Sequence, residues 1–294
     1  MTEAEWESSE DPAALLRHLD VIYEPGIVSE PGFRPKPKIS DRKMRLFACA
    51  CCRHIWEWLA PNYSKRIIDA AEGFADGAAP WSAVSDSGRK SGPGVECLRM
   101  PEADAGARAA AALAAQHYPA VLPAYAALLR GIAGNPFMVV ERRHRHGSGD
   151  GSVISARKRN PAPGERLMVL AEWWLTDDVR RLARAAYDER LPDGTLDPAR
   201  LLVLADALEE AGCAGDICQE CKGEGKTHWR ARDDEEDRWF RYTTHAGYRR
   251  EDWMEKCEAC GGAGRLPHAL LEHLRSPGPH YRGMWSLDLV LGKE

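Results

Sequence analysis

Long uninterrupted apolar runs are missing from this sequence, and no stretch approaches the roughly 20 residues that a membrane-spanning helix needs. The first six residues are acidic and carry no apolar run, so we expect no secretory signal and place the chain in the reducing cytoplasm. A phosphate-binding loop, a dinucleotide fingerprint and a Ser/His/Asp order are also missing. These absences disfavour membrane insertion, secretion and the commonest nucleotide-dependent and hydrolytic enzymes.

An excess of positive charge is lacking as well. The 40 Lys and Arg residues are outnumbered by 45 Asp and Glu residues, which gives a formal net charge of −5. This balance disfavours a protein whose surface is dominated by phosphate binding, although a local basic patch is compatible with it. With 294 residues, 44% of them hydrophobic, the chain is long enough for one substantial core and a smaller appendage.

The sequence does contain two copies of one nine-residue pattern. Residues 218–226 and 257–265 both read Cys-x-x-Cys-x-Gly-x-Gly followed by a basic residue. Zn²⁺ takes four tetrahedral ligands and binds thiolates well, so two such turns facing each other complete its shell. The predicted metal ligands are Cys218, Cys221, Cys257 and Cys260. Glycine reaches positive φ without a Cβ penalty, which we expect at Gly223, Gly225, Gly262 and Gly264.

The repeated pattern resembles the DnaJ-type cysteine-rich domain, over residues 218–265 only. That family carries four copies of the motif and two zinc ions. The two copies present here therefore imply one Zn²⁺ per chain, held by the four cysteines named above. The chain lacks the His-Pro-Asp tripeptide of the J domain, which argues against co-chaperone activity. A client-binding role, as such zinc modules have, is an expectation of the resemblance.

Disulfides and a redox-sensing dithiol are the alternatives to zinc for these cysteines. Disulfides do not persist in a reducing compartment. A thioredoxin-like motif lies where a strand enters a helix in a βαβ unit, and glycine-punctuated turns are not typical of that position. We therefore favour zinc and keep the redox-sensing dithiol as a third reading of the function.

A second resemblance covers most of the remaining chain. It rests on the segments 1–6, 40–53, 134–137, 186–190, 204–213 and 288–294. These segments are similar to hallmarks of a large planctomycete-type paralogue family of uncharacterised proteins. Members of that family run almost directly from the equivalent of 204–213 into the equivalent of 270–278. The resemblance implies a helical body of residues 1–216, a zinc-binding insert at 217–266, and a segment 267–294 that completes the body.

Caps and hydrophobic periodicity predict a mainly α fold, in which an all-helical body carries a small zinc-knuckle insert resembling a β-hairpin. Thr2 with Glu5 forms a capping box, and Thr176 is a predicted N-cap. The expected helices cover 13–19, 41–60, 103–117, a segment reaching 132, a segment following 176, and 198–211. A stripe at spacings of three and four is predicted to be buried: Met44, Phe47, Cys51, Ile55 and Trp58.

Two segments, 77–101 and 141–164, interrupt the helical pattern and are predicted to be loops. The second is locally basic, since it contains Arg142, Arg143 and Arg157 among its six Lys or Arg residues. One reading is an arm that grips the phosphates of a nucleic acid. The other, which we favour, is a solvated insertion with too little apolar surface to order itself.

The segment 222–256 combines aromatic residues with balanced charge. It lies between the second cysteine of the first motif and the first cysteine of the second. Nine basic and nine acidic residues cancel, and the aromatics are Trp229, Trp239, Phe240, Tyr242, Tyr248 and Trp253. Such aromatics either contact a protein or peptide partner or pack over the zinc, and both readings stay open. We expect a non-catalytic scaffold that binds another protein, with a nucleic-acid-binding protein using 141–164 as the alternative.

Catalysis has weak support in the sequence. Four thiolates leave a zinc ion no open position, and the spacing of His228 and His245 fits no known way of replacing a cysteine. A nucleophile or second metal among Cys49, Cys51, Cys52 and His54 is less favoured than buried helical thiols. No catalytic residue is predicted, and Cys97 and Cys213 are assigned no role.

Overall fold

The structure is a computed structural model, and it describes residues 1–20, 39–59, 63–86, 95–145, 153–155, 166–215, 221–222, 224–228, 254–258 and 260–293. Its contacts divide the chain into two compact units. The first, called the body below, comprises Met1–Ala211 and His273–Glu294, and the second, called the small unit, comprises Gly212–Glu272. The predicted bounds of the insert, 217–266, stay a prediction, because residues 216–220 are not among those described.

Helices dominate the described residues, as predicted. The α-helices are α1 Glu3–Ser8, α2 Pro12–Asp20, α3 Asp41–His54, α4 Tyr63–Ala75, α5 Trp81–Ser85, α6 Ala103–His117, α7 Leu122–Ala133, α8 Asp177–Asp188, α9 Pro198–Glu210, α11 Ala269–Arg275 and α12 Trp285–Leu291. The 3₁₀ helices are η1 Trp56–Trp58, η2 Glu96–Arg99, η3 Pro119–Val121 and η4 Glu172–Trp174. None of these helices has both the length and the apolar character needed to cross a membrane.

Side-chain caps fix where several helices begin. At α1 the Thr2 hydroxyl accepts from the Glu5 amide and the Glu5 carboxylate accepts from the Thr2 amide, which is the predicted capping box. Thr176 caps α8 by accepting from Val179 N–H at 3.2 Å. These bonds satisfy amides that a helix cannot pair internally, so the start points could be predicted locally.

Helix α3 lies at the centre of the body, where it packs against α4, α6 and α7. The predicted stripe on α3 is buried at Met44, Phe47, Cys51 and Ile55, while the side chain of Trp58 lies outside the described part. The helix ends at His54, earlier than the predicted residue 60. The Ala-rich face of α6 is buried in the same core as α3. Alanine side chains are small, so they let two helices approach closely.

The body is not all helical, so that prediction was wrong. Strands β1 Met138–Arg145, β2 Val153–Ser155 and β3 Arg166–Ala171 form one sheet in the order β2-β1-β3. Strand β1 runs parallel to β3 and antiparallel to β2. The apolar runs at 138–140 and 167–171 suit a buried parallel strand, but periodicity alone does not distinguish so short a run from a buried helix.

Parts of both predicted loops are regular structure. Residues 141–145 and 153–155 of the basic segment lie in β1 and β2, paired as His144 with Ile154. The 77–101 segment contains α5 and η2, while residues 87–94 are not described. Tertiary pairing thus overrode the polar, glycine-rich composition that led to the loop prediction.

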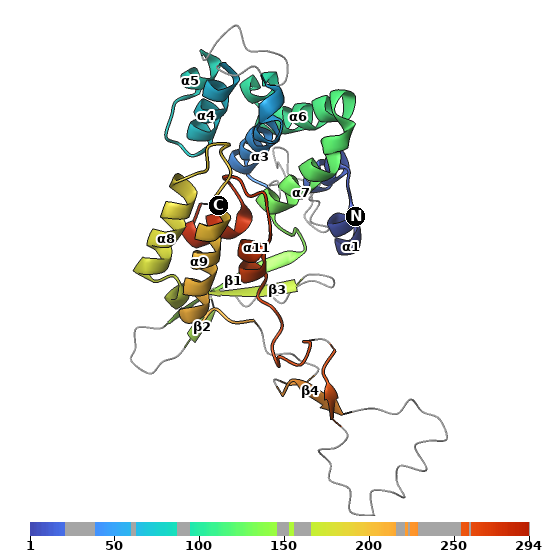
Figure 1. The fold of residues 1–294 in the computed structure, drawn as a ribbon, viewed down its shortest axis with the longest axis vertical. Helices are drawn as coiled ribbons and strands as arrows, with labels where there is room; N and C mark the ends of the chain where they lie inside the picture. Colours follow the sequence, from blue (N-terminus) through green and yellow to red (C-terminus); the bar gives the residue numbers. More distant parts are fainter. Residues whose placement is uncertain are drawn as a thin grey trace, which may run out of the picture. The chain divides into compact units, whose positions relative to one another are not determined.

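Helices α8 and α9 lie side by side in the body (Figure 1). A turn at residues 191–194 joins them, with Gly194 N–H donating to Leu191 O at 2.8 Å. Their inner faces are buried at Val179, Ala183, Ala186 and Tyr187 of α8 and at Leu201, Leu204, Ala205 and Leu208 of α9. Each helix buries one stripe, so the pair depends on its neighbours for stability.

Candidate metal centre

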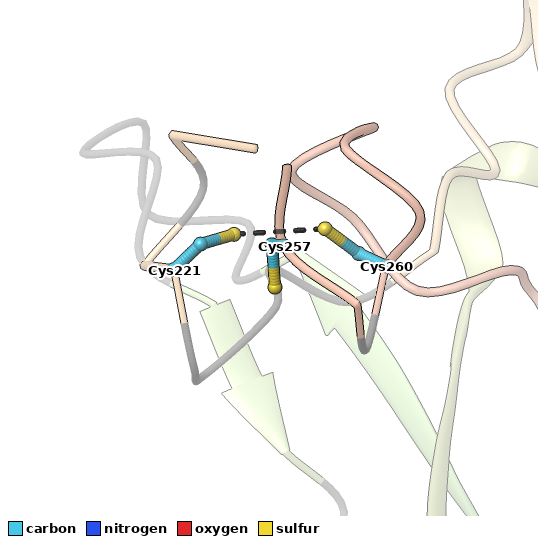
Figure 2. A group of neighbouring side chains, drawn as sticks. All are labelled: Cys221, Cys257 and Cys260. Carbon is cyan, nitrogen blue, oxygen red and sulfur yellow. Dashed lines mark hydrogen bonds between the residues drawn. The ribbon is translucent and has the colours of Figure 1, made fainter. Parts of the chain in front are cut away.

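Three buried cysteines meet in the small unit. The sulfurs of Cys221, Cys257 and Cys260 all lie within 4.8 Å of one another, and those of Cys221 and Cys260 are 3.6 Å apart (Figure 2). With Zn–S bonds of about 2.3 Å, tetrahedral geometry places two sulfurs about 3.8 Å apart. The three thiols therefore fit a metal ion that prefers sulfur, and they could hold one.

The two copies of the motif fold in the same way around their second cysteines. Gly225 N–H donates to the Cys221 sulfur at 3.3 Å, and Gly264 N–H donates to the Cys260 sulfur at 3.3 Å. In each copy the donor lies four residues after the cysteine. An amide aimed at a sulfur stabilises negative charge on it, so both turns favour the thiolate that binds a metal.

Positive φ angles shape both turns. Lys222 and Gly261, each directly after the second cysteine, have φ of 50° and 58°, and Gly225 and Gly264 have φ of 72° and 75°. A Cβ on Gly225 would lie 2.3 Å from the carbonyl oxygen of Gly262. A side chain at Gly225 is therefore excluded twice, by its backbone conformation and by the close approach of the second turn.

The sequence prediction for the glycines holds where the structure describes them. Positive φ occurs at Gly225, Gly262 and Gly264, while Gly223 is outside the described residues. The repeat therefore reflects a repeated backbone path as well as repeated ligands.

A short antiparallel hairpin brings the two motifs together. Strands β4 Lys226–His228 and β5 Met254–Lys256 pair with Thr227 opposite Glu255. The pairing continues into the site, because Cys257 N–H donates to Gly225 O at 3.0 Å. The backbone thus places Cys257 beside the first turn even though the two motifs are distant in sequence.

The pKa of the Cys260 thiol is lowered in this cluster. Burial by itself raises the pKa of this thiol, but hydrogen bonds from Gly264 N–H and from the thiols of Cys221 and Cys257 outweigh burial and lower the pKa to about 7. A thiol with this pKa is substantially ionised at neutral pH, and the thiolate is the form that binds metal.

Several predicted residues of the small unit lie outside the described part. Cys218 is one of them, so it stays the predicted fourth ligand. The same holds for His245 and for the aromatics Trp229, Trp239, Phe240, Tyr242, Tyr248 and Trp253. His228 lies in β4, within the hairpin next to the cysteines.

The cysteines of α3 are core residues, as favoured from the sequence. Cys49, Cys51 and Cys52 are all buried, and burial raises the pKa of the Cys49 and Cys51 thiols well above the usual range. A hydrogen bond with Cys97, whose sulfur is 3.8 Å away, raises that of Cys52, and burial adds to it. Protonated, enclosed thiols are poor nucleophiles and poor ligands.

The described part of the basic segment carries ion pairs within the body. Arg142 contacts Glu172 at 3.1 Å, and Arg143 contacts Glu141 at 2.9 Å. These two cations already have carboxylate partners, which weakens their electrostatic attraction for a phosphate. Of the remaining Lys and Arg residues, Arg145 is the last residue of β1 and those at 157–159 are not described.

A cavity in the body was not predicted from the sequence. It measures about 400 Å³ and is lined by residues of α1, α7 and the segment 273–285, among them Arg130, His273 and Trp285. These residues share no motif or periodicity, so no sequence signal identified them as neighbours.

Three comparisons, with models of protein families, with curated proteins and with solved structures, find no match to this chain.

Proposed function

We propose that the chain is a non-catalytic scaffold in which one structural Zn²⁺, held by Cys218, Cys221, Cys257 and Cys260, stabilises a surface that binds another protein. The observation that carries this proposal is the meeting of three buried cysteine sulfurs within 4.8 Å of one another. Cys218 is the fourth ligand because it occupies, in the first motif, the position that Cys257 occupies in the second.

The donor set favours zinc in a structural role. Four thiolates make a closed tetrahedral shell, whereas a catalytic zinc keeps one position for water or substrate. Amide donors aimed at the sulfurs of Cys221 and Cys260 suit metal-bound thiolates, and the lowered pKa of Cys260 supports a thiolate there at neutral pH. Ligation in small zinc peptides supplies on the order of 10 kcal/mol, enough to order a segment that buries little apolar surface by itself.

The partner part of the proposal rests on composition. Residues 222–256 carry six Trp, Tyr or Phe residues among charges that cancel. Tryptophan and tyrosine bury a large apolar area at small entropic cost and are enriched where proteins bind proteins. Balanced charge is unlike the basic surface that phosphates attract, so a protein or peptide is the favoured partner.

Metal content tests the structural zinc directly. Native mass spectrometry of the purified chain, before and after chelation, should show one zinc ion lost per chain. Alkylation with mass mapping in parallel should show Cys218, Cys221, Cys257 and Cys260 becoming reactive after chelation. A metal-free chain with these four cysteines paired as disulfides would contradict the proposal and favour the redox-sensing alternative.

A pair of variants separates the metal site from general damage. Cys221→Ser should lose the zinc ion and the order of the small unit while the helical circular dichroism of the body persists. Cys213→Ala, which changes a buried cysteine outside the motif, should keep one zinc ion. If Cys221→Ser kept its zinc, the ligand assignment would be wrong.

Partner binding needs its own assay. Peptide display against the zinc-loaded chain should enrich sequences that no longer bind Cys221→Ser. Binding of duplex DNA or RNA, with affinity that falls steeply as salt rises, would instead support the nucleic-acid alternative. Enrichment that is equal for both proteins would show that the zinc-stabilised surface is not the binding site.

A further inference from the structure

The cavity of about 400 Å³ in the body is large enough for a ligand of one or two rings. We call it the α7 pocket, because residues 124–132 of that helix form much of its wall. Trp6 and Glu7 of α1 contribute to the lining, as do the residues 276–281 and Trp285 from the end of the chain. It is built entirely from the body, so it is independent of the cysteine cluster and of the function proposed for it.

Aromatic rings cover one part of this pocket. The ring of His273 lies 5.0 Å from that of Trp285 and 5.4 Å from that of His280. Gly134 packs against Trp285, where a Cβ would come within 3.2 Å of the ring, so this glycine helps fix the indole in place. Rings at these separations offer a flat ligand both face and edge contacts.

The imidazoles add hydrogen bonding without adding charge. Burial lowers the pKa of His273 to about 3, with the neighbouring His280 and Lys43 contributing, and burial also lowers the pKa of His280. His273 Nδ1 is hydrogen-bonded to Ser286 Oγ at 2.8 Å, while its Nε2 bonds to no described residue. A neutral ring with one nitrogen engaged keeps the other for a ligand.

Arg130 supplies the positive charge of the pocket. Its Nη1 donates to the carbonyl oxygens of Ser9 at 2.7 Å and Trp6 at 3.3 Å, which fixes the guanidinium. No carboxylate of the described residues lies within ion-pair distance of it, and burial lowers its pKa, which the charges of Glu7 and Glu10 only partly offset. A fixed, partly desolvated cation without a bound carboxylate favours an anion beside it.

We propose that the α7 pocket binds a small aromatic carboxylate, whose ring packs against Trp285 and His273 and whose carboxylate pairs with Arg130. The remaining guanidinium N–H groups, Nε and Nη2, donate to no described residue, and together they match the two oxygens of a carboxylate. Because the imidazoles are neutral, the charged groups of the lining are Arg130 and Glu7, and of these two only Arg130 favours an anionic ligand over a neutral one.

Three matched probes test this inference: 2-naphthoate, its neutral amide 2-naphthamide, and the cation 2-naphthylmethylammonium. Isothermal titration calorimetry on the full zinc-loaded chain should give 2-naphthoate the tightest binding, about tenfold or more above the amide, as expected for a charge-assisted hydrogen bond. Equal affinity for acid and amide, tighter binding of the cation, or no binding of any probe would each overturn the proposal.

Two variants locate the bound acid. Arg130→Met should abolish the preference for 2-naphthoate over 2-naphthamide, while Arg181→Met, which changes an exposed arginine outside the pocket, should keep it. Unchanged preference in Arg130→Met overturns the role of this residue.

If Arg130→Met has a weaker helical circular dichroism signal than wild type, Gly131→Ala is used as the test variant in its place. The added Cβ would lie 3.7 Å from His273 Nε2, an ordinary contact distance, so the fold tolerates a methyl group that occupies ligand space. We expect about tenfold weaker binding of 2-naphthoate in this variant. Wild-type affinity in Gly131→Ala would show that the acid binds elsewhere and would overturn the proposal.

Discussion

Arg42 and Asp288 lie 246 positions apart in the sequence, yet Arg42 Nη1 donates a 2.6 Å hydrogen bond to Asp288 Oδ2 in the core of the body. The Asp288 side chain is fully buried, and the same guanidinium donates to Asp76 at 2.8 Å and to the Tyr187 hydroxyl at 2.7 Å. One arginine of α3 thereby connects the end of α4, α8 and α12. This network joins the last helix of the chain to the first half of the body.

Asp288→Asn should destabilise the body by about 1–3 kcal/mol, because Arg42 loses its charge-assisted bond to Asp288 while its ion pair with Asp76 remains. Urea unfolding followed by circular dichroism measures the loss. Asp178→Asn is the matched control, since its pair with Arg181 is largely exposed, and we expect a change within about 0.5 kcal/mol. Equal effects of the two variants would contradict a structural role for the buried pair.

Gly225→Ala should weaken metal binding more than Gly261→Ala. Both residues have positive φ, so both variants carry the backbone strain of about 1–2 kcal/mol. Only at Gly225 does the new Cβ meet another group, the Gly262 carbonyl at 2.3 Å, whereas Gly261 has nothing within 4 Å. Competition with a chromogenic chelator measures the two affinities, and we expect a gap of about tenfold or more.

If Gly261→Ala were the weaker binder, the contact between the two turns would not be what positions the ligands. If both variants bound like wild type, the turns would adapt to the metal more freely than the structure indicates.

Acid should destabilise the body partly through His273. The unfolded chain takes up a proton on this residue below the ordinary pKa of 6.5, while the folded protein resists protonation until about pH 3. Its contribution to stability is therefore complete above pH 6.5 and is lost as pH falls from 6.5 toward 3. In His273→Asn the amide takes the place of Nδ1 beside Ser286, and up to about 2 kcal/mol of the loss between pH 7 and pH 5 should vanish. Urea midpoints across this range measure the difference, and parallel pH profiles for variant and wild type would show that His273 is not protonated on unfolding.

Thiol reactivity should divide the cysteines into two classes. Cys221, Cys257 and Cys260 should react quickly with iodoacetamide once metal is removed, because the small unit then loses the order that buries these thiols. Cys49, Cys51 and Cys52 should react only after urea unfolds the body, since they lie in its hydrophobic core and the pKa of each thiol is raised well above its usual range. Peptide mapping by mass spectrometry separates the classes, and rapid labelling of the α3 cysteines in the folded chain would contradict their burial.

Much of the helical structure was predictable because its signals are local. A cap such as Thr176 and the stripe that contains Met44 and Phe47 depend on residues three or four positions apart. The metal motif is local in the same sense, because each Cys-x-x-Cys turn brings its own ligands and glycines. Three of the four predicted ligands lie together in the structure, and the fourth, Cys218, is outside the described residues.

The sequence by itself determined the starts of helices, the stripes they bury and the repeated cysteine turn, since each arises from bonds and contacts within a few residues. Only the tertiary structure decided that 138–143 pairs in parallel with 166–171, that Arg42 meets Asp288, and that Arg130 shares a pocket with His273 and Trp285. These arrangements join segments far apart in the chain. Their free energy comes from burial and charge pairing between such segments, which local periodicity does not record.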